Sequence, residues 1–348
     1  SPTSDAPASF SVQLKRLTVD NLTAVYDDRA EGVYAAVEAL EATCSGDLGS
    51  DNTTIRLKAE TPSVSFRSGG VPMLSRAEVK AEMDVDADLK NMKFTLSDNT
   101  LQLNAIRAAI DGWVDLTDEG VDMDLSLSSN EIGFKEILSL IPAIYAKDFE
   151  GLRTDGVATL SATAKGSLIG EDIVPAFDVV LDVKNAMFRY PSLPAGVDNI
   201  NVAAKVQNPG GSIDLTTVNI NPFNFVLAGN PFSLTADVRT PVSDPDFHLT
   251  AKGKLDLGKI KDIYPLEDMT LNGRVRADMS LAGRMSYLEK EQYERFAANG
   301  SITLNDMQVE LEGIPAVAIE KSTFTFTPQY LNLSETTVMV GDNDVTAD

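Results

Sequence analysis

The sequence has very few of the residues that most catalytic and metal sites use. Among 348 residues there is one histidine and one cysteine. Neither a zinc site of clustered histidines and cysteines nor an intrachain disulfide can therefore form. Basic residues are also scarce, since 29 lysines and arginines stand against 52 acidic residues and leave a net charge of −23. This charge repels phosphate backbones and anionic lipid headgroups, so we expect no nucleic-acid partner.

Long hydrophobic runs and catalytic motifs are absent as well. No stretch reaches the roughly 20 apolar residues that a bilayer-spanning helix needs. There is no Gly-x-Ser-x-Gly elbow, phosphate-binding loop or dinucleotide-binding glycine fingerprint. We therefore expect a protein that is not an enzyme, with no catalytic residue, metal or cofactor. Because the chain opens at Ser1-Pro2 without a signal peptide, we expect a piece of a longer protein from which an anchor has been removed.

The sequence is instead rich in alternation of apolar and polar residues, which is typical of half-buried strands. Met83–Leu89 puts apolar residues on one face and three aspartates on the other, and Val121–Leu127 repeats the pattern. Because 43% of positions are apolar, which is ordinary for a globular protein, we expect the chain to be able to bury a sizeable core and to be ordered. The alternation predicts a mainly β fold: an elongated repeat of antiparallel β meanders that form a curved sheet or groove, with a few short helices.

Turn signals and two helical stretches interrupt the alternation. Apolar residues at three- and four-residue spacing from Phe134 to Tyr145 predict a helix limited by Pro142. The charged stretch Tyr287–Ala298 predicts a surface helix inserted between strands. Glycine-containing sequences predict turns at Asp155-Gly156, Pro209-Gly210-Gly211, Asn272-Gly273 and Asn299-Gly300.

The remaining chemically notable residues have plain structural interpretations. Cys44 fits a small strand residue better than a nucleophile, and His248 fits a solvent-facing strand position. Asp342-Asn343-Asp344 fits a polar turn better than a calcium loop. Asp84 and Asp86 stand about 7 Å apart on one strand face, which resembles the carboxylate pair of a glycosidase. A solvated face explains them better, and an acidic carbohydrate-active enzyme stays open as a further hypothesis.

Self-comparison indicates an internal repeat with a period of about 120 residues. Three ordered landmarks recur, and the strands at the third landmark match one another in each copy. The repeat predicts three units: 1–130, 131–250 with a linking helix, and 251–348 truncated at the C-terminus, in one continuous elongated domain. The landmarks are Leu40–Leu48, Leu160–Leu168 and Ser280–Met285; then Phe66-Arg67 with Val71-Pro72, Phe188-Arg189 with Leu193-Pro194, and Val309 with Ile314-Pro315; then Leu101–Leu103, Ile213–Leu215 and Leu331–Leu333.

Several stretches together resemble the periplasmic region of the AsmA family, most of all its versions from the Bacteroides lineage. The likeness covers nearly the whole chain and depends on a diffuse β pattern more than on invariant residues. The stretches that carry it are Val12–Asn21 followed by Val25–Asp28, Ile137–Tyr145 leading into Thr154–Gly156, Phe188–Tyr190 through Leu193-Pro194 to Pro245-Asp246, and Leu255–Leu257 with the Gly273 strand.

The resemblance implies a Gram-negative envelope protein, held in the inner membrane by an N-terminal helix and projecting into the periplasm. The related TamB-like and chorein-type proteins form long β grooves lined with apolar residues, which carry phospholipid between membranes, and family members are tied to outer-membrane assembly. The expected partners are therefore phospholipid or another acyl-chain ligand, the inner membrane through a missing N-terminal helix, and other envelope proteins. This chain departs from the family by lacking the anchor.

The residues and the resemblance raise one physical question: what covers the apolar strand faces? A lipid-binding groove is the first hypothesis, because acyl chains lose roughly 0.8 kcal/mol of hydration cost per buried CH₂ without needing polar contacts. A structural scaffold or adhesion module with an ordinary packed core is the second. The predicted groove-lining residues are Val85, Leu89, Phe94, Leu96, Leu101, Leu103, Val121, Met123, Leu125, Leu127, Phe177, Val179, Leu181, Val183, Ile213, Leu215, Leu331 and Leu333.

Overall fold

The structure is a computed structural model of the chain. It describes residues 15–29, 33–47, 50–68, 71–138, 152–170, 173–263, 269–311, 314–327, 331–334, 336–340 and 343–347. These residues divide into two compact units. Unit 1 comprises the described residues up to 129 together with 163–170, and unit 2 comprises 130–138, 152–162 and those from 173 onward.

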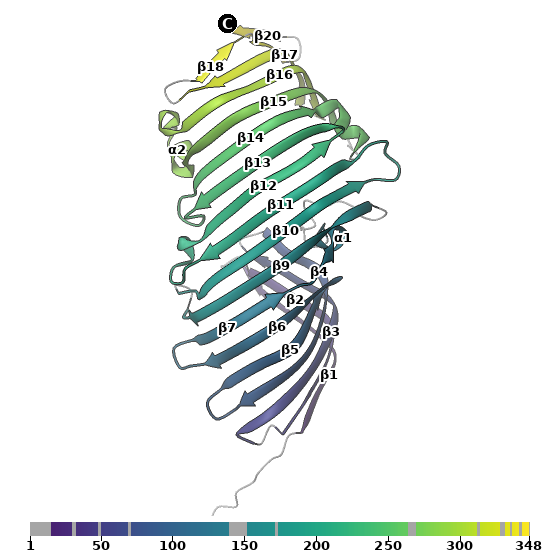
Figure 1. Cartoon of the computed structure of the whole chain (residues 1–348), viewed down its shortest axis with the longest axis vertical. Coiled ribbons are helices and arrows are strands. Elements are labelled where there is room, and N and C mark those ends of the chain that lie inside the picture. Colours follow the sequence, from purple (N-terminus) through teal and green to yellow (C-terminus); the bar gives the residue numbers. More distant parts are fainter. Residues whose placement is uncertain are drawn as a thin grey trace, which may run out of the picture. The chain divides into compact units, whose positions relative to one another are not determined.

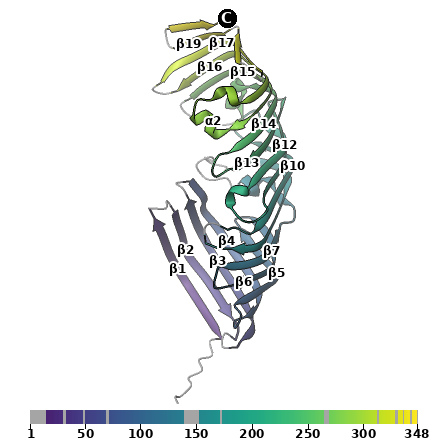
Figure 2. The same ribbon diagram turned by 90° about the vertical axis from the view of Figure 1, so that its left-hand side faces the viewer.

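Unit 1 contains seven long strands that pair in chain order, each antiparallel to the next. The sheet of this unit curls, so that β1 and β2 lie across from β5 and β7 (Figure 2). The strands are β1 (Arg16–Asp28), β2 (Val33–Ser45), β3 (Asn52–Ser68), β4 (Val71–Asp88), β5 (Lys93–Leu103), β6 (Ile106–Leu116) and β7 (Val121–Ser128).

Unit 2 continues the same antiparallel pattern, and Figure 1 shows β10 to β17 side by side in chain order. The last residues of β9 belong to unit 1. Its elements are β8 (Ile132–Gly133), α1 (Phe134–Leu138), β9 (Arg153–Leu168), β10 (Ala176–Arg189), β11 (Val197–Asn208), the 3₁₀ turn η1 (Ile213–Leu215), β12 (Thr217–Leu227), β13 (Asn230–Arg239), β14 (Asp246–Asp256), η2 (Leu257–Asp262), β15 (Met269–Arg284), α2 (Met285–Glu289), η3 (Tyr293–Arg295), β16 (Ala297–Leu311), β17 (Ile314–Phe326), β18 (Leu331–Ser334), β19 (Thr336–Val340) and β20 (Asn343–Ala347).

The predicted fold class is confirmed. In the described part of the chain, twenty strands belong to one antiparallel sheet, and the helices are short. Alternation along the strands produces this result because successive side chains of a strand point to opposite faces. None of the helices in the described segments has both the length and the hydropathy that crossing a bilayer requires.

β-Bulges recur along the strands, and side chains of the neighbouring strand satisfy the backbone N–H groups that the bulges release. The Asn21 N–H donates to Glu41 Oε1 at 3.2 Å and the Ala39 N–H to Thr23 Oγ1 at 3.2 Å. Likewise the Asn185 N–H donates to Asn201 Oδ1 at 3.0 Å. All three donors have φ near +50°, and such bulges bend a strand and increase its twist.

Three of the four predicted turns are wrong, because glycine serves a different purpose there. Asp155-Gly156 lies inside β9, Asn272-Gly273 inside β15 and Asn299-Gly300 inside β16. Gly156 has φ +101°, and a Cβ at this position would run into Ala186 of β10. Positive φ and close backbone approach suit glycine in strands as well as in turns. Pro209-Gly210-Gly211 does connect two elements, β11 and η1.

The first predicted helix is described only in part, and the second differs from its prediction. The first predicted helix spans Phe134–Leu138, and the rest of that prediction, including Pro142 and Tyr145, lies outside the described residues. Asp342, of the predicted polar turn, also lies outside them. The second prediction, Tyr287–Ala298, is wrong as one helix. It resolves into the end of α2, the turn η3 and the start of β16. Aromatic packing accounts for the break, because Phe296 packs edge-on against Tyr287 and tilted against Phe247.

The first two repeat landmarks fall at matching places in the chain. The first lies at the end of β2, β9 and β15, and the second lies at the connections β3–β4, β10–β11 and β16–β17. The third differs between copies, because Ile213–Leu215 is a 3₁₀ turn rather than the predicted strand. The Ser212 hydroxyl accepts a hydrogen bond from the Asp214 N–H and caps this turn. The division into three units stays a prediction.

Candidate apolar binding faces

Cross-strand register places the apolar residues of unit 1 on one face of its sheet. In antiparallel strands, directly paired residues point to the same face. One such row runs from Val85 through Leu96 and Gly112 to Leu125. Two parallel rows are Ala87–Phe94–Val114–Met123 and Ala59–Ala81–Leu101–Ala108. We call this surface the unit-1 apolar face.

Most of the residues predicted in this unit to line a groove share that face. Leu89 is different, because it lies in the turn after β4, where its N–H donates to the Asp51 carbonyl at 2.7 Å. The residues on the face are Val85, Phe94, Leu96, Leu101, Leu103, Val121, Met123, Leu125 and Leu127, and each is half-buried. Cys44 also lies on it, as a half-buried strand residue paired with Leu17 and Leu57.

Very few large side chains are fully buried in unit 1. Among its described residues, the buried apolar side chains are Ile106 and four alanines, at positions 36, 77, 87 and 108. A domain with a packed core normally buries many leucine, isoleucine, valine and phenylalanine side chains. The side chains of the unit-1 apolar face are therefore only partly shielded from solvent.

The strands of unit 2 carry a similar face, which we call the unit-2 apolar face. Its residues are mostly half-buried, and Leu249 is 38% exposed. Of the predicted lining residues, Phe177, Val179, Leu181 and Val183 belong to β10, and Leu333 pairs with Phe324. Leu331 pairs in register with Phe326, whereas Ile213 and Leu215 are exposed in η1. One long row on the face is Leu181–Ala204–Ile220–Ala236–Leu249–Leu281–Ala298.

One end of the unit-2 apolar face is covered by a packed cluster. Phe134 and Leu138 of α1 pack there with Leu152, Ile263 and residues of β9 to β11, and all of these are buried. Of the predicted lining residues, Val183 is 3% exposed inside this cluster and Leu181 packs against it. A conventional core therefore exists, but it occupies one region of the unit.

The opposite face of the sheet is polar, charged and exposed. Cross-strand ion pairs join Arg56 with Asp84 at 3.7 Å and Lys252 with Asp278 at 2.9 Å. Asp86 accepts a hydrogen bond from the Thr54 hydroxyl. Such exposed pairs each contribute little to stability. His248 is exposed on this face, as predicted. In the described part of the chain, no group of three or more acidic, histidine or cysteine side chains is placed to hold a metal ion.

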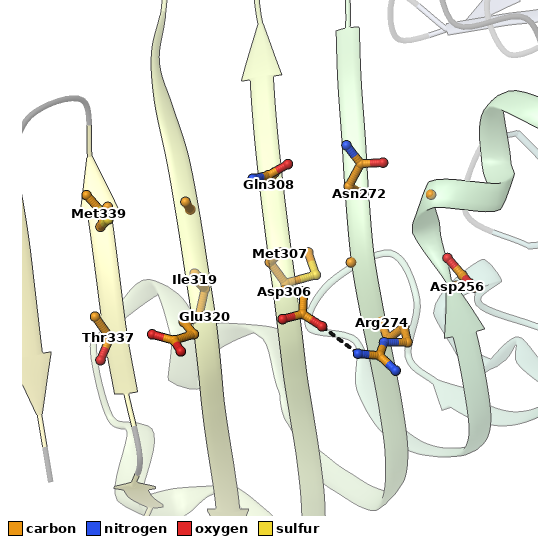
Figure 3. Close-up of a pocket in the computed structure, with 13 residues that line it drawn as sticks. Asp256, Asn272, Arg274, Asp306, Met307, Gln308, Ile319, Glu320, Thr337 and Met339 are labelled. Atoms are coloured by element: carbon orange, nitrogen blue, oxygen red, sulfur yellow. Dashed lines mark hydrogen bonds and ion pairs between the residues drawn. The ribbon is translucent and has the colours of Figure 1, made fainter.

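Figure 3 shows an open pocket on this polar face, within unit 2. It has a volume of about 510 Å³ and crosses β15 to β17 and β19. Asn272 and Gln308 lie side by side in it, and Arg274 forms an ion pair with Asp306 (Figure 3). Sequence reasoning missed this pocket, because Asn272-Gly273 indicated a turn and not a bulged strand.

Sequence reasoning also missed Asn99, which lies on the unit-1 apolar face. It pairs with Ile110 of β6, which pairs in turn with Leu127. A register shift between Leu96 and Asn99 brings the asparagine onto the same face as both flanking leucines. The sequence does contain a signal for it. In β5 the apolar residues change from even positions, Phe94 and Leu96, to odd positions, Leu101 and Leu103, and Asn99 lies between the two pairs.

No known family model, curated protein or solved structure matches the chain. Its function therefore has to be argued from the two apolar faces and the residues on them.

Proposed function

We propose that the chain is the periplasmic part of an envelope protein anchored in the inner membrane, which binds or conducts phospholipid along an apolar β surface and supports outer-membrane assembly. The observation that carries the proposal is the shortage of large buried side chains in unit 1. Ile106 is the one large apolar residue that is buried among the described residues of this unit, although apolar side chains follow one another across a face of its sheet.

Acyl chains are well suited to such a face. Burying apolar surface releases roughly 25 cal/mol per Å², and it does so without directional contacts. Rows of half-buried side chains such as Val85, Leu96 and Leu125 offer a continuous surface of this kind. The charged opposite face keeps the protein soluble. The resemblance to the AsmA family independently supports phospholipid as the ligand and the periplasm as the location.

The proposal is tested by asking which lipids accompany the purified protein. The chain is produced in the periplasm of a Gram-negative host and purified without detergent, and bound phospholipid is extracted and counted per protein. We expect stoichiometric phospholipid. The double variant Leu96→Glu/Leu125→Glu should lose most of it, because two carboxylates flanking Gly112 would lie where acyl chains pack, and burying a charge there is costly.

The matched control is Thr95→Glu/Ser126→Glu, on the same two strands. Both of these residues are exposed on the polar face, so the control should retain its lipid. Equal lipid loss in both variants, or no lipid in the unmodified chain, would contradict the proposal.

The packed cluster around α1 favours a second candidate function, a structural scaffold or adhesion module of the envelope. In that case the faces are covered by further protein, and the purified chain carries no lipid. The unmodified chain should then assemble with an envelope protein that buries Leu96 and Leu125, and hydrogen exchange at these residues should slow in that complex.

A further inference from the structure

Asn99 is a fully buried polar side chain surrounded by aliphatic ones. It is 1% exposed. Leu96 and Leu101 flank it along β5, and Ile110 is its direct partner on β6. These three aliphatic side chains are only half-buried, so they can rearrange when an apolar chain lies over them. Asn99 thus lies within the unit-1 apolar face.

Only one end of the Asn99 carboxamide has a partner. Its Oδ1 accepts a hydrogen bond from the Asp84 N–H at 2.6 Å, where the β4 register shifts between Glu82 and Val85. This contact fixes which end of the Asn99 amide points to Asp84, because the amide nitrogen cannot accept a hydrogen bond from the Asp84 N–H. Nδ2 is buried and donates to no acceptor among the residues that the structure describes. Buried donors are normally paired, since an unpaired one loses its hydration without compensation.

Among the described residues one other asparagine, Asn208, is deeply buried, and it shows what a purely structural role looks like. Asn208 is 3% exposed. Its Nδ2 donates to the Ser212 carbonyl and to Thr216 Oγ1, each at 3.0 Å, and its Oδ1 accepts from the Gly210 N–H at 2.8 Å. Both ends of that amide are satisfied by the chain itself. In Asn99 the oxygen end is satisfied, whereas the nitrogen end is buried without an acceptor, within the face that we propose to bind a ligand.

We infer that Asn99 Nδ2 is the hydrogen-bond donor for the carbonyl oxygen of an acyl ester or amide held on the unit-1 apolar face. This inference rests on the proposed function and names the ligand chemistry. A neutral donor among aliphatic side chains suits a neutral carbonyl, whereas a carboxylate or phosphate would carry charge into the same surroundings. A plain hydrocarbon offers no acceptor. Asn99 would therefore hold an acyl chain at its ester linkage, and the chain would extend over the apolar side chains of the unit-1 apolar face.

The test compares an ester with a hydrocarbon of similar length on the full chain. Bound 1,6-diphenylhexatriene, a hydrocarbon probe, is displaced by methyl laurate or by tridecane while its fluorescence is followed. We expect methyl laurate to displace the probe at a concentration about tenfold lower, since one hydrogen bond that satisfies a buried donor is worth roughly that factor. Lauric acid in its ionised form should displace the probe less well than its methyl ester.

Asn99→Leu should bring the ratio of ester to alkane near one while tridecane binds as before. The matched control is Asn104→Ala. Asn104 Oδ1 accepts from the Glu78 N–H of β4 at 2.9 Å. Asn104→Ala therefore also removes a side-chain acceptor for a backbone N–H of β4, but Asn104 lies in the β5–β6 turn. The control should keep the tenfold preference. A preference that is absent in the unmodified chain, or unchanged in Asn99→Leu, would overturn the inference.

A second measurement needs no variant. The infrared carbonyl band of ¹³C-carbonyl methyl laurate should lie at lower wavenumber when bound to the unmodified chain than in dodecane, because a hydrogen bond weakens the C=O bond. An unshifted band would also overturn the inference. Failure of the proposed function looks different, because the chain would then bind neither the hydrocarbon probe nor tridecane.

Discussion

Replacing Leu125 by threonine should cost unit 1 little stability, because this leucine lies on an uncovered face. Full burial of a leucine side chain contributes about 1.5–3 kcal/mol. Leu125 is half-buried, and its cross-strand partner Gly112 contributes no side chain to the contact. Threonine fits a strand well, so the expected loss is about 1 kcal/mol. The same replacement at Ile106, which is 5% exposed, should cost about 2–5 kcal/mol.

Urea unfolding followed by tryptophan fluorescence measures both losses. The chain has one tryptophan, Trp113, which lies in β6 and pairs with Asp124 on the polar face. It therefore reports the unfolding of unit 1 without touching either substituted side chain. If Leu125→Thr costs as much as Ile106→Thr, a packed layer covers the apolar face, and the reasoning that leads to a ligand-binding surface fails.

Two further predictions concern the backbone and pH. Gly112 has φ +124°, and a Cβ there would run into the Asp124 carbonyl, so Gly112→Ala should lower the melting temperature. The loss should exceed that from Gly170→Ala, where φ is also positive but no atom lies within 4 Å; equal losses would contradict the steric argument. Hydrogen bonds from the Ser243 side chain and N–H lower the pKa of Asp214 below its ordinary 3.8. The stability from this contact should therefore be present well above the ordinary pKa of 3.8 and be lost as the pH falls toward and through the lowered pKa. Amide exchange at Ser243, corrected for intrinsic rates, should accelerate over the same fall in pH.

The sequence by itself determined the class of fold. Apolar and polar residues alternate along strands such as Met83–Leu89, and a period of two permits only one arrangement of faces. It also located most of the apolar stripes, because each stripe depends on neighbours along the same strand, but Leu89 and the pair Ile213 and Leu215 lie in turns. His248 and Cys44 followed from the same local rule. These predictions succeeded because the interactions that decide them lie within a few residues of one another.

Glycine positions were predicted poorly for a physical reason. Asp155-Gly156, Asn272-Gly273 and Asn299-Gly300 have the composition of tight turns, yet each lies inside a strand. Turns and bulged strands both require positive φ or close backbone approach. Which of the two forms depends on the strand that pairs alongside, and this pairing is not written in the local sequence.

Tertiary structure alone decided what covers the apolar faces and which polar group lies among them. The alternating pattern of unit 1 is compatible with either a packed core or an open surface, and the partial burial of its apolar side chains favours the open surface. Asn99 reaches the apolar face because a register shift in β5 changes the parity of the strand, and its oxygen is held by the β4 backbone. Contacts between strands fix both facts, so only the folded sheet shows an amide nitrogen without a partner on the surface that we propose to bind lipid.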